Sequence, residues 1–227
     1  MIDYARLQSE QNNKLIFDNV YFSWPKKKNC VIKNCSFSLS KPGLWMLVGK
    51  NGCGKSTLIK LIKGILQPTN GSIIRPTNLS LVFQNPDHQI LMPTCGSELT
   101  LSIKSALSEK AINTKINYCL KAVGLKGFLK RPIHTLSGGQ KQKLAIASAV
   151  ISESNFILMD EPTALLDRES REQILNIIKT LINNAKQPIT VLWITHRLDE
   201  LIYADKVSVM KNGKLSPWQE PKSLNYN

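Results

Sequence analysis

The chain has 227 residues, 42% of them hydrophobic, and carries a formal net charge of +14. A chain of this length can bury one sizeable core, with room for a smaller second lobe, but not two large domains. No apolar run approaches the roughly 18 residues of a membrane-spanning helix, and the opening sequence MIDYARLQSEQ lacks the basic-then-apolar order of a secretory signal, so we expect a protein of the cytoplasm or the stroma.

The first third of the chain is predicted to be rich in β-strands. Short segments that are apolar, or that alternate between apolar and polar residues, lie between Pro and Gly breaks. After Gly54, apolar residues recur at helical spacing as far as Pro68, which predicts one helix among these strands. The predicted strands are 15–22, 31–39, 44–48, 72–74 and 79–83.

The middle of the chain differs from both flanks, because residues 97–130 have apolar positions at helical spacing and no strong strand. We therefore expect a helical lobe over residues 96–152. After residue 140, helices and strands alternate, which is typical of a parallel sheet. The predicted elements there are strands 156–159, 190–194 and 207–210, a helix over 168–181, and another helix between the last two strands.

These elements predict an α/β fold in one domain, residues 1–227. Residues 15–83 and 153–215 are expected to form the sheet core, with an antiparallel β part at the N-terminal end and a mixed or parallel sheet beyond it. The helical lobe is inserted between these two segments.

Two features of composition limit the possible partners. Residues 19–86 contain ten Lys or Arg and no acidic residue, which favours phosphate-bearing ligands, anionic lipid headgroups or nucleic acid. A lysine-rich surface with no dedicated partner is the alternative. The five cysteines show no CxxC pairing, so we expect reduced thiols and no structural metal.

The segment GKNGCGKST fits the pattern G-x-x-x-x-G-K-[ST], directly after an apolar strand and at the start of a helix. Glycines allow successive N–H groups to turn towards phosphates, and the helix N-terminus adds partial positive charge. Lys55 is expected to reach the β- and γ-phosphates of a bound nucleotide, and Ser56 to ligate Mg²⁺. The predicted nucleotide-binding residues are Gly49, Lys50, Asn51, Gly52, Cys53, Gly54, Lys55, Ser56 and Thr57.

A pair of carboxylates follows a second apolar strand, in the segment FILMDEPT. Ligands of open α/β sheets collect at the carboxyl ends of the strands, so this pair is expected beside the phosphate loop. Asp160 is predicted to hold Mg²⁺, and Glu161 to act as the general base that activates water.

Together these motifs resemble those of the ATP-binding cassette ATPases, and the resemblance covers nearly the whole chain, from Leu15 to Leu215. It implies a P-loop NTPase fold of that type. It also implies a head-to-tail dimer, in which each ATP lies between one subunit's P-loop and the other's signature segment. The positions that complete the family's motif order are Gln84, the signature Leu136-Ser137-Gly138-Gly139-Gln140, Asp167 and His196.

The resemblance assigns a role to each of these positions. Ser137 and the N–H groups near Gly138 and Gly139 would form a second anion cradle at a helix N-terminus, facing the γ-phosphate. Asp167 would couple the two subunits across the dimer.

Three further roles come from the resemblance, each with an alternative. Gln84 would sense Mg²⁺ and the attacking water, and His196 would contact the γ-phosphate and steady Glu161. Without the family, both would be read as ordinary polar residues at strand ends. Trp24 lies where the family places an adenine-stacking aromatic, although a core tryptophan is the competing interpretation.

Residues 81–94, LVFQNPDHQILMPT, resemble the corresponding segment of cobalt-type and energy-coupling-factor transporter ATPases, including cyanobacterial and plastid relatives. Such ATPases drive uptake of metal ions or vitamins by pairing with an integral membrane subunit. The resemblance therefore implies a peripheral protein on the cytoplasmic or stromal face of a membrane. It would act as a homodimer or as a heterodimer with a paralogous ATPase, and no nucleic acid partner is expected.

Two of the chain's departures from this branch concern contacts with other subunits. Glu98-Leu99-Thr100-Leu101-Ser102 stands where the branch shows an acidic residue followed by Val-Ala-Phe-Gly, so the surface that faces the membrane subunit differs. Leu165 stands where a glycine or another small residue is usual, which affects the coupling between subunits.

Two other functions compete with this interpretation. A soluble cassette ATPase acting on nucleic acid or ribosomes would suit the basic segments, but such proteins usually carry two cassettes or a long coiled-coil insertion. A non-catalytic partner of an active paralogue would be expected to have lost one of Lys55, Asp160, Glu161 or His196, and all four are present.

Overall fold

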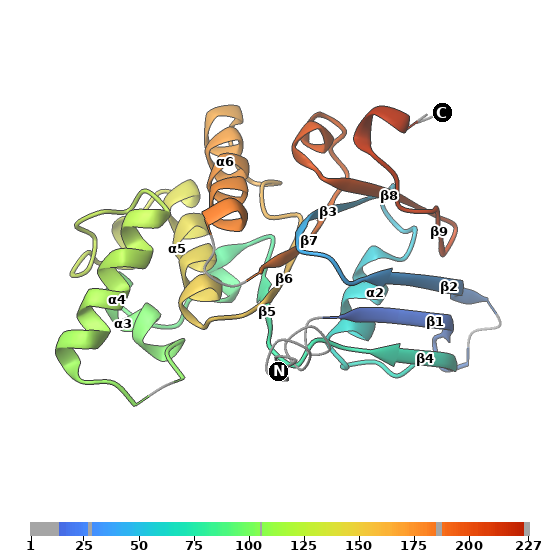
Figure 1. The fold of residues 1–227 in the computed structure, drawn as a ribbon, viewed down its shortest axis with the longest axis horizontal. Coiled ribbons are helices and arrows are strands. Elements are labelled where there is room, and N and C mark those ends of the chain that lie inside the picture. Colours follow the sequence, from blue (N-terminus) through green and yellow to red (C-terminus); the bar gives the residue numbers. More distant parts are fainter. Residues whose placement is uncertain (1–13, 27–28, 105, 185–187, 225–227) are drawn as a thin grey trace, which may run out of the picture.

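The computed structural model describes residues 14–26, 29–104, 106–184 and 188–224. A cluster of helices and a three-stranded antiparallel sheet lie at opposite ends of the molecule, with a six-stranded sheet between them (Figure 1). The strand order is β2-β1-β4 in the small sheet and β5-β6-β7-β3-β8-β9 in the large one. Neighbouring strands of the large sheet are parallel, except for the antiparallel β8 and β9.

The strands of the small sheet are β1 (Leu15–Ser23), β2 (Cys30–Leu39) and β4 (Asn70–Ile74). Those of the large sheet are β3 (Gly43–Val48), β5 (Leu79–Val82), β6 (Phe156–Asp160), β7 (Thr190–Thr195), β8 (Lys206–Lys211) and β9 (Lys214–Leu215). The α-helices are α2 (Lys55–Ile62), α3 (Cys95–Leu101), α4 (Glu109–Ala122), α5 (Gly138–Ile151) and α6 (Arg168–Asn184). Short 3₁₀ helices are η1 (Pro86–His88), η2 (Ile133–Thr135), η3 (Asp199–Tyr203) and η4 (Pro221–Ser223).

The central strands are buried on both faces, as expected for a parallel sheet covered on each side. Along β6, Ile157 and Met159 belong to the core beneath the helical cluster, whereas Phe156 and Leu158 belong to the core shared with α2 and the small sheet. This period of two follows from the pleat, which sends successive side chains to opposite faces. The large sheet therefore separates two hydrophobic cores and contributes to both.

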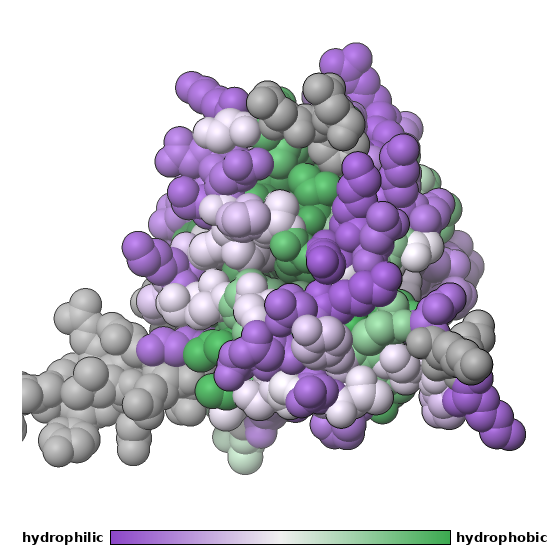
Figure 2. Space-filling view, turned by 90° about the vertical axis from the view of Figure 1, so that its right-hand side faces the viewer, coloured by the Kyte–Doolittle hydropathy of each residue, from purple (hydrophilic) through white to green (hydrophobic). Residues whose placement is uncertain are grey.

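The end of the molecule that carries the small sheet is largely polar. Figure 2 shows hydrophilic side chains over most of this face, with hydrophobic side chains gathered in a band between them. None of the helices in the described part of the chain is long and apolar enough to cross a membrane. All five cysteines have free thiols.

The structure confirms the α/β class and corrects two predicted helices. The helix after Gly54 ends at Ile62, well before Pro68, because Gly64 adopts a left-handed backbone with φ of 74° that ends the helix. Between β7 and β8 there is no α-helix but only the 3₁₀ turn η3, since Asp205 N–H already donates to Leu44 O and draws the chain into the sheet.

Candidate active site

Three strands bring part of the predicted site to one edge of the large sheet. Val48, the last residue of β3, pairs in register with Thr195 at the end of β7, and Asp160 at the end of β6 pairs with Ile194. The segments that follow these strands therefore leave the sheet at the same level. Those segments contain the phosphate loop, Glu161 and His196.

The phosphate loop, residues 49–54, has a backbone that requires glycine. Gly52 and Gly54 have φ of 79° and 116°, in the left-handed region that side chains disfavour. A Cβ on Gly49 would lie 2.6 Å from Met210 O, and one on Gly54 would lie 2.7 Å from Met210 Cε. The loop thus packs directly against β8 and leads into the N-terminus of α2, where free N–H groups favour an anion.

Lys55 is held at the centre of this loop. Its side chain is almost completely buried, and its Nζ donates to Gly49 O at 2.6 Å and to Lys50 O at 3.3 Å. Nζ also lies 3.6 Å from Glu161 Oε1. The ammonium group is therefore directed inward between the loop and the carboxylate.

Glu161 lies between a cation and an imidazole. Its Oε2 lies 3.0 Å from His196 Nδ1, and its backbone N–H donates to Ile194 O at 2.8 Å. Its φ of 46° places a non-glycine residue in the left-handed region, a strained conformation that is concentrated at functional sites. The structure thus brings Lys55, Glu161 and His196 together, as the sequence predicts.

Asp160 is adjacent to Glu161 and is partly buried. Burial raises its pKa above the ordinary range, the charge of Glu161 raises it further, and Lys55 acts in the opposite direction. A cation bound at this carboxylate would relieve that penalty. The electrostatics of the site therefore favour a positive charge beside Asp160.

The residues present fit Mg²⁺ bound with ATP. The candidate ligands, Ser56 and Asp160, offer oxygen atoms, which Mg²⁺ prefers. Among the described residues, no cluster of three or more His, Cys, Asp and Glu side chains could hold a metal ion. In nucleotide sites Mg²⁺ usually takes several of its ligands from phosphate oxygens and water, so few protein ligands are needed.

Two predicted residues are not drawn into this group. Gln84 follows β5 with an exposed side chain, which forms no hydrogen bond within the described part of the chain. Trp24 is half-buried, packs edge-on against Phe22 at 5.2 Å between ring centroids, and has Lys60 Nζ 5.5 Å from its ring centroid. The indole is thus neither a core residue nor fully exposed.

The signature segment begins α5 with a reciprocal cap. Ser137 Oγ accepts from Gln140 N–H at 3.3 Å, and Gln140 Oε1 accepts from Ser137 N–H at 3.0 Å. Leu136 is buried, whereas Ser137 and Gly138 are exposed. Helices α5 and α2 lie on opposite sides of β6 and β7 (Figure 1), so the signature is separated from the phosphate loop of its own chain.

Asp167 is exposed and holds the start of α6. Ser170 N–H and Ser170 Oγ both donate to its carboxylate at 2.8 Å, and these hydrogen bonds hold its pKa below the ordinary value. A Cβ on Gly139 would lie 3.0 Å from Ser170 Oγ. Asp167 and the signature segment are therefore connected within one chain through Ser170.

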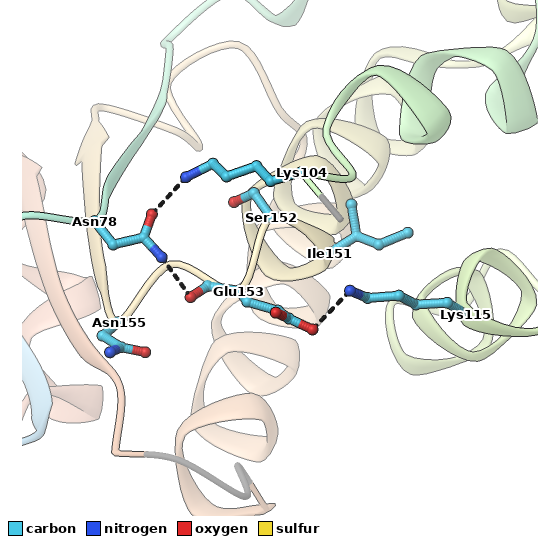
Figure 3. A pocket seen from close by; sticks show the side chains of 7 residues that line it. All are labelled: Asn78, Lys104, Lys115, Ile151, Ser152, Glu153 and Asn155. Carbon is cyan, nitrogen blue, oxygen red and sulfur yellow. Dashed lines mark hydrogen bonds and ion pairs between the residues drawn. The ribbon is translucent and has the colours of Figure 1, made fainter. Parts of the chain in front are cut away.

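A cavity of about 340 Å³ lies apart from this site, where the helical cluster joins β5 and β6 (Figure 3). Lys104 Nζ donates to Asn78 Oδ1 at 2.7 Å, Asn78 Nδ2 donates to Glu153 O at 2.8 Å, and Lys115 Nζ lies 2.6 Å from Glu153 Oε1. None of its lining residues belongs to the phosphate loop. These contacts join the helical cluster to the sheet rather than form a nucleotide pocket.

Sequence reasoning missed one polar group beside the site. Glu200 is completely buried, and it accepts hydrogen bonds from Thr163 Oγ1 and from Trp193 Nε1. The three residues are separated by up to 37 positions along the chain. No local motif marks them, so only the folded chain shows that they meet.

A family model described as ABC transporter matches residues 32–164. The chain belongs to the ABC transporter family. This ABC protein is 40% identical over 187 residues to "ABC transporter I family member 10" of Arabidopsis thaliana, covering 82% of this chain and 69% of that protein. It is 36% identical over 199 residues to "Energy-coupling factor transporter ATP-binding protein EcfA1" of Streptococcus pyogenes serotype M1, covering 81% and 71%.

A solved structure agrees with these relatives. The ABC protein superimposes on cbiO1 from Clostridium perfringens, titled part of the ABC transporter complex cbiONQ, with a TM-score of 0.84 and 28% identity. The match covers 92% of this chain and 88% of cbiO1. The chain is thus an ATP-binding and ATP-hydrolysing subunit of an ABC transporter, with the fold of that family's ATPase domain.

Proposed function

We propose that this ABC ATPase drives solute uptake as a member of the cobalt-type or energy-coupling-factor branch, of the cyanobacterial or plastid kind. The Streptococcus and Clostridium relatives support the branch, and the Arabidopsis relative supports a link to plants. The solute would be a metal ion or a vitamin. Integral membrane subunits would bind it, while this chain supplies the energy from the inner face of the membrane.

Catalysis rests on the arrangement of Lys55, Glu161 and His196. Glu161 acts as general base on the attacking water, because it lies at the sheet edge beside the phosphate loop with one oxygen towards each neighbour. His196 orients that carboxylate and meets the γ-phosphate. Lys55 leaves its loop carbonyls to pair with the phosphates, and its positive charge stabilises the charge that develops during transfer.

Mg²⁺ would be held by Ser56 and Asp160, with Gln84 approaching when the nucleotide and the partner are present. When bound, it neutralises charge on the β- and γ-phosphate oxygens. The raised pKa of Asp160 supports this assignment, since the carboxylate is unfavourably ionised without a cation.

The working unit is a head-to-tail dimer, either of two copies or of this chain with a paralogue. Ser137, Gly138 and Gly139 of one chain face the γ-phosphate bound to the P-loop of the other. The separation of α5 from α2 supports this assembly, because within one chain the two helices lie on different sides of β6 and β7. Asp167 lies at the same face and is exposed for contact with the second chain.

The Glu161→Gln variant tests the catalytic assignment. We expect ATP turnover to fall by about 100-fold or more, the loss typical for removal of a general base. ATP with Mg²⁺ should also dimerise this variant, as measured by sedimentation velocity. Glu172→Gln, at an exposed carboxylate of α6, is the matched control and should retain turnover. Unchanged turnover in Glu161→Gln would remove Glu161 from the mechanism.

The transport assignment needs its own test. Purification of the tagged chain from membranes should recover an integral subunit in fixed ratio, and vesicles containing that complex should take up a labelled vitamin or metal ion only with ATP. Uptake that continues unchanged with Glu161→Gln would contradict the coupling of transport to this ATPase.

A further inference from the structure

The carboxylate of Glu200 is buried beside the catalytic edge. It belongs to η3, four residues after His196, and only 1% of its surface is exposed. Oε1 accepts from Thr163 Oγ1, and Oε2 accepts from Trp193 Nε1 at 3.0 Å. Within the residues that the structure describes, no Lys, Arg or His forms an ion pair with this carboxylate.

A carboxylate in such a position is costly unless its oxygens are hydrogen-bonded. An apolar side chain could fill the same space without that cost, so packing alone gives no reason for a glutamate here. What a carboxylate offers is two directed acceptors. Hydrogen bonds to a charged acceptor are roughly twice as strong as those between neutral groups, and they fix the donors closely.

The two donors come from segments that carry the catalytic residues. Thr163 is almost completely buried and lies two residues after Glu161, in the loop that leads to Asp167. Thr163 O also accepts from Leu166 N–H at 3.1 Å, so the hydroxyl and the carbonyl of Thr163 both hold that loop. Trp193 lies in β7, three residues before His196.

Glu200 therefore links the loop of residues 161–167 to the strand end that carries His196. A second link, between Glu161 Oε2 and His196 Nδ1 at 3.0 Å, joins the same two segments at the reacting edge. Among the described residues, Glu200 forms no hydrogen bond or ion pair with Lys55 or Ser56 of the nucleotide-binding segment.

We propose that Glu200 is a positioning residue for ATP hydrolysis, because its carboxylate fixes Thr163 and thereby sets the loop carrying Glu161 and Asp167 relative to His196. The inference rests on the proposed roles of Glu161 and His196. Loss of the link leaves nucleotide binding intact and displaces the general base and the intersubunit loop. A variant that lacks this link should therefore have a lower kcat and an unchanged KM for ATP.

The test uses the full chain with ATP and Mg²⁺. Thr163→Val keeps the shape of the side chain and removes its hydroxyl, and we expect kcat to fall about tenfold while KM changes less than about twofold. Thr163→Ser keeps the hydroxyl and should restore kcat. The Thr163→Val/Glu200→Gln double variant should be no slower than Thr163→Val, because the loss of the Thr163 hydroxyl already breaks the link between the loop and β7.

Two controls separate positioning from folding and from the wider assignment. Ile178→Val, at a buried position of α6, lowers stability without altering the hydrogen bonds of Glu200 and should leave kcat unchanged. If Ile178→Val has the same melting temperature as Thr163→Val and loses as much kcat, the inference is overturned. A wild-type kcat in Thr163→Val would also overturn it. If Thr163→Val is normal while Glu161→Gln is inactive, the catalytic assignment stands and only the role of Glu200 fails.

Discussion

Gly138→Ala separates the fold of the chain from contacts made across a dimer. Gly138 is the first residue of α5 and is exposed. A Cβ there would lie 4.0 Å from Leu166 Cδ2, which is an ordinary van der Waals contact. Alanine in a helix is more favourable than glycine by at most about 1 kcal/mol. We therefore expect the free energy of unfolding to stay the same or to rise slightly.

If the backbone at Gly138 meets a phosphate, the effect of Gly138→Ala on kcat should be large. A backbone N–H stabilises an oxyanion from about 2.7–3.1 Å, whereas a methyl carbon needs about 3.5–4.0 Å from a neighbouring atom. The added methyl group of Gly138→Ala thus keeps the phosphate beyond hydrogen-bonding range. Loss of one such donor costs about 100-fold in kcat, and we expect a decrease of that size.

Steady-state ATP hydrolysis and urea unfolding, measured on the same preparation, decide the question. His134→Ala, at an exposed position just before the signature, is the control and should retain its turnover. A Gly138→Ala variant with normal stability and normal kcat would refute the reasoning, because the exposed face of the signature would then meet no phosphate.

Three further predictions follow from single positions. Asp160→Asn should raise the melting temperature at pH 7. The folded pKa of Asp160 is raised, so ionisation of this carboxylate destabilises the fold as pH rises from the unfolded pKa through the folded pKa. In acid the wild-type carboxyl group is neutral and the gain should vanish, which a pH series of melting curves would show. Gly71→Ala should lower the free energy of unfolding by about 1–3 kcal/mol or more, because φ is 85° and the added Cβ would lie 2.3 Å from Asn19 O. The midpoint of urea unfolding measures this loss of stability, and an unchanged midpoint would contradict the prediction. Trp24→Ala should raise KM for ATP more than it lowers kcat, whereas Trp24→Tyr should behave as wild type, in steady-state kinetics.

The parts of the site that sequence could predict are those with local causes. The phosphate loop depends on the spacing of glycines between a strand and a helix, and the adjacent residues Asp160 and Glu161 follow from the end of one apolar strand. The strands were predictable because their alternation reflects the two cores. Each of these features is decided within about ten residues of chain.

The features that sequence could not predict depend on distant contacts or on absent molecules. The hydrogen bond between Glu200 and Thr163 joins residues 37 positions apart. The segment between β7 and β8 ends where Asp205 N–H donates to Leu44 O of β3, which is also a distant contact. The strand β9 is two residues long and is recognised only by its pairing with β8. Gln84 is exposed, and its proposed role depends on Mg²⁺ and the attacking water, which are not part of the chain.

The sheet that keeps α2 and α5 apart has a consequence for how fast the isolated chain can work. If each active site contains residues from two chains, ATP turnover per chain should increase with protein concentration and decrease on dilution. A membrane scaffold that tethers two copies would replace that dependence with a fixed effective concentration. Free chains would then hydrolyse little ATP, and most hydrolysis would take place in assembled transporters.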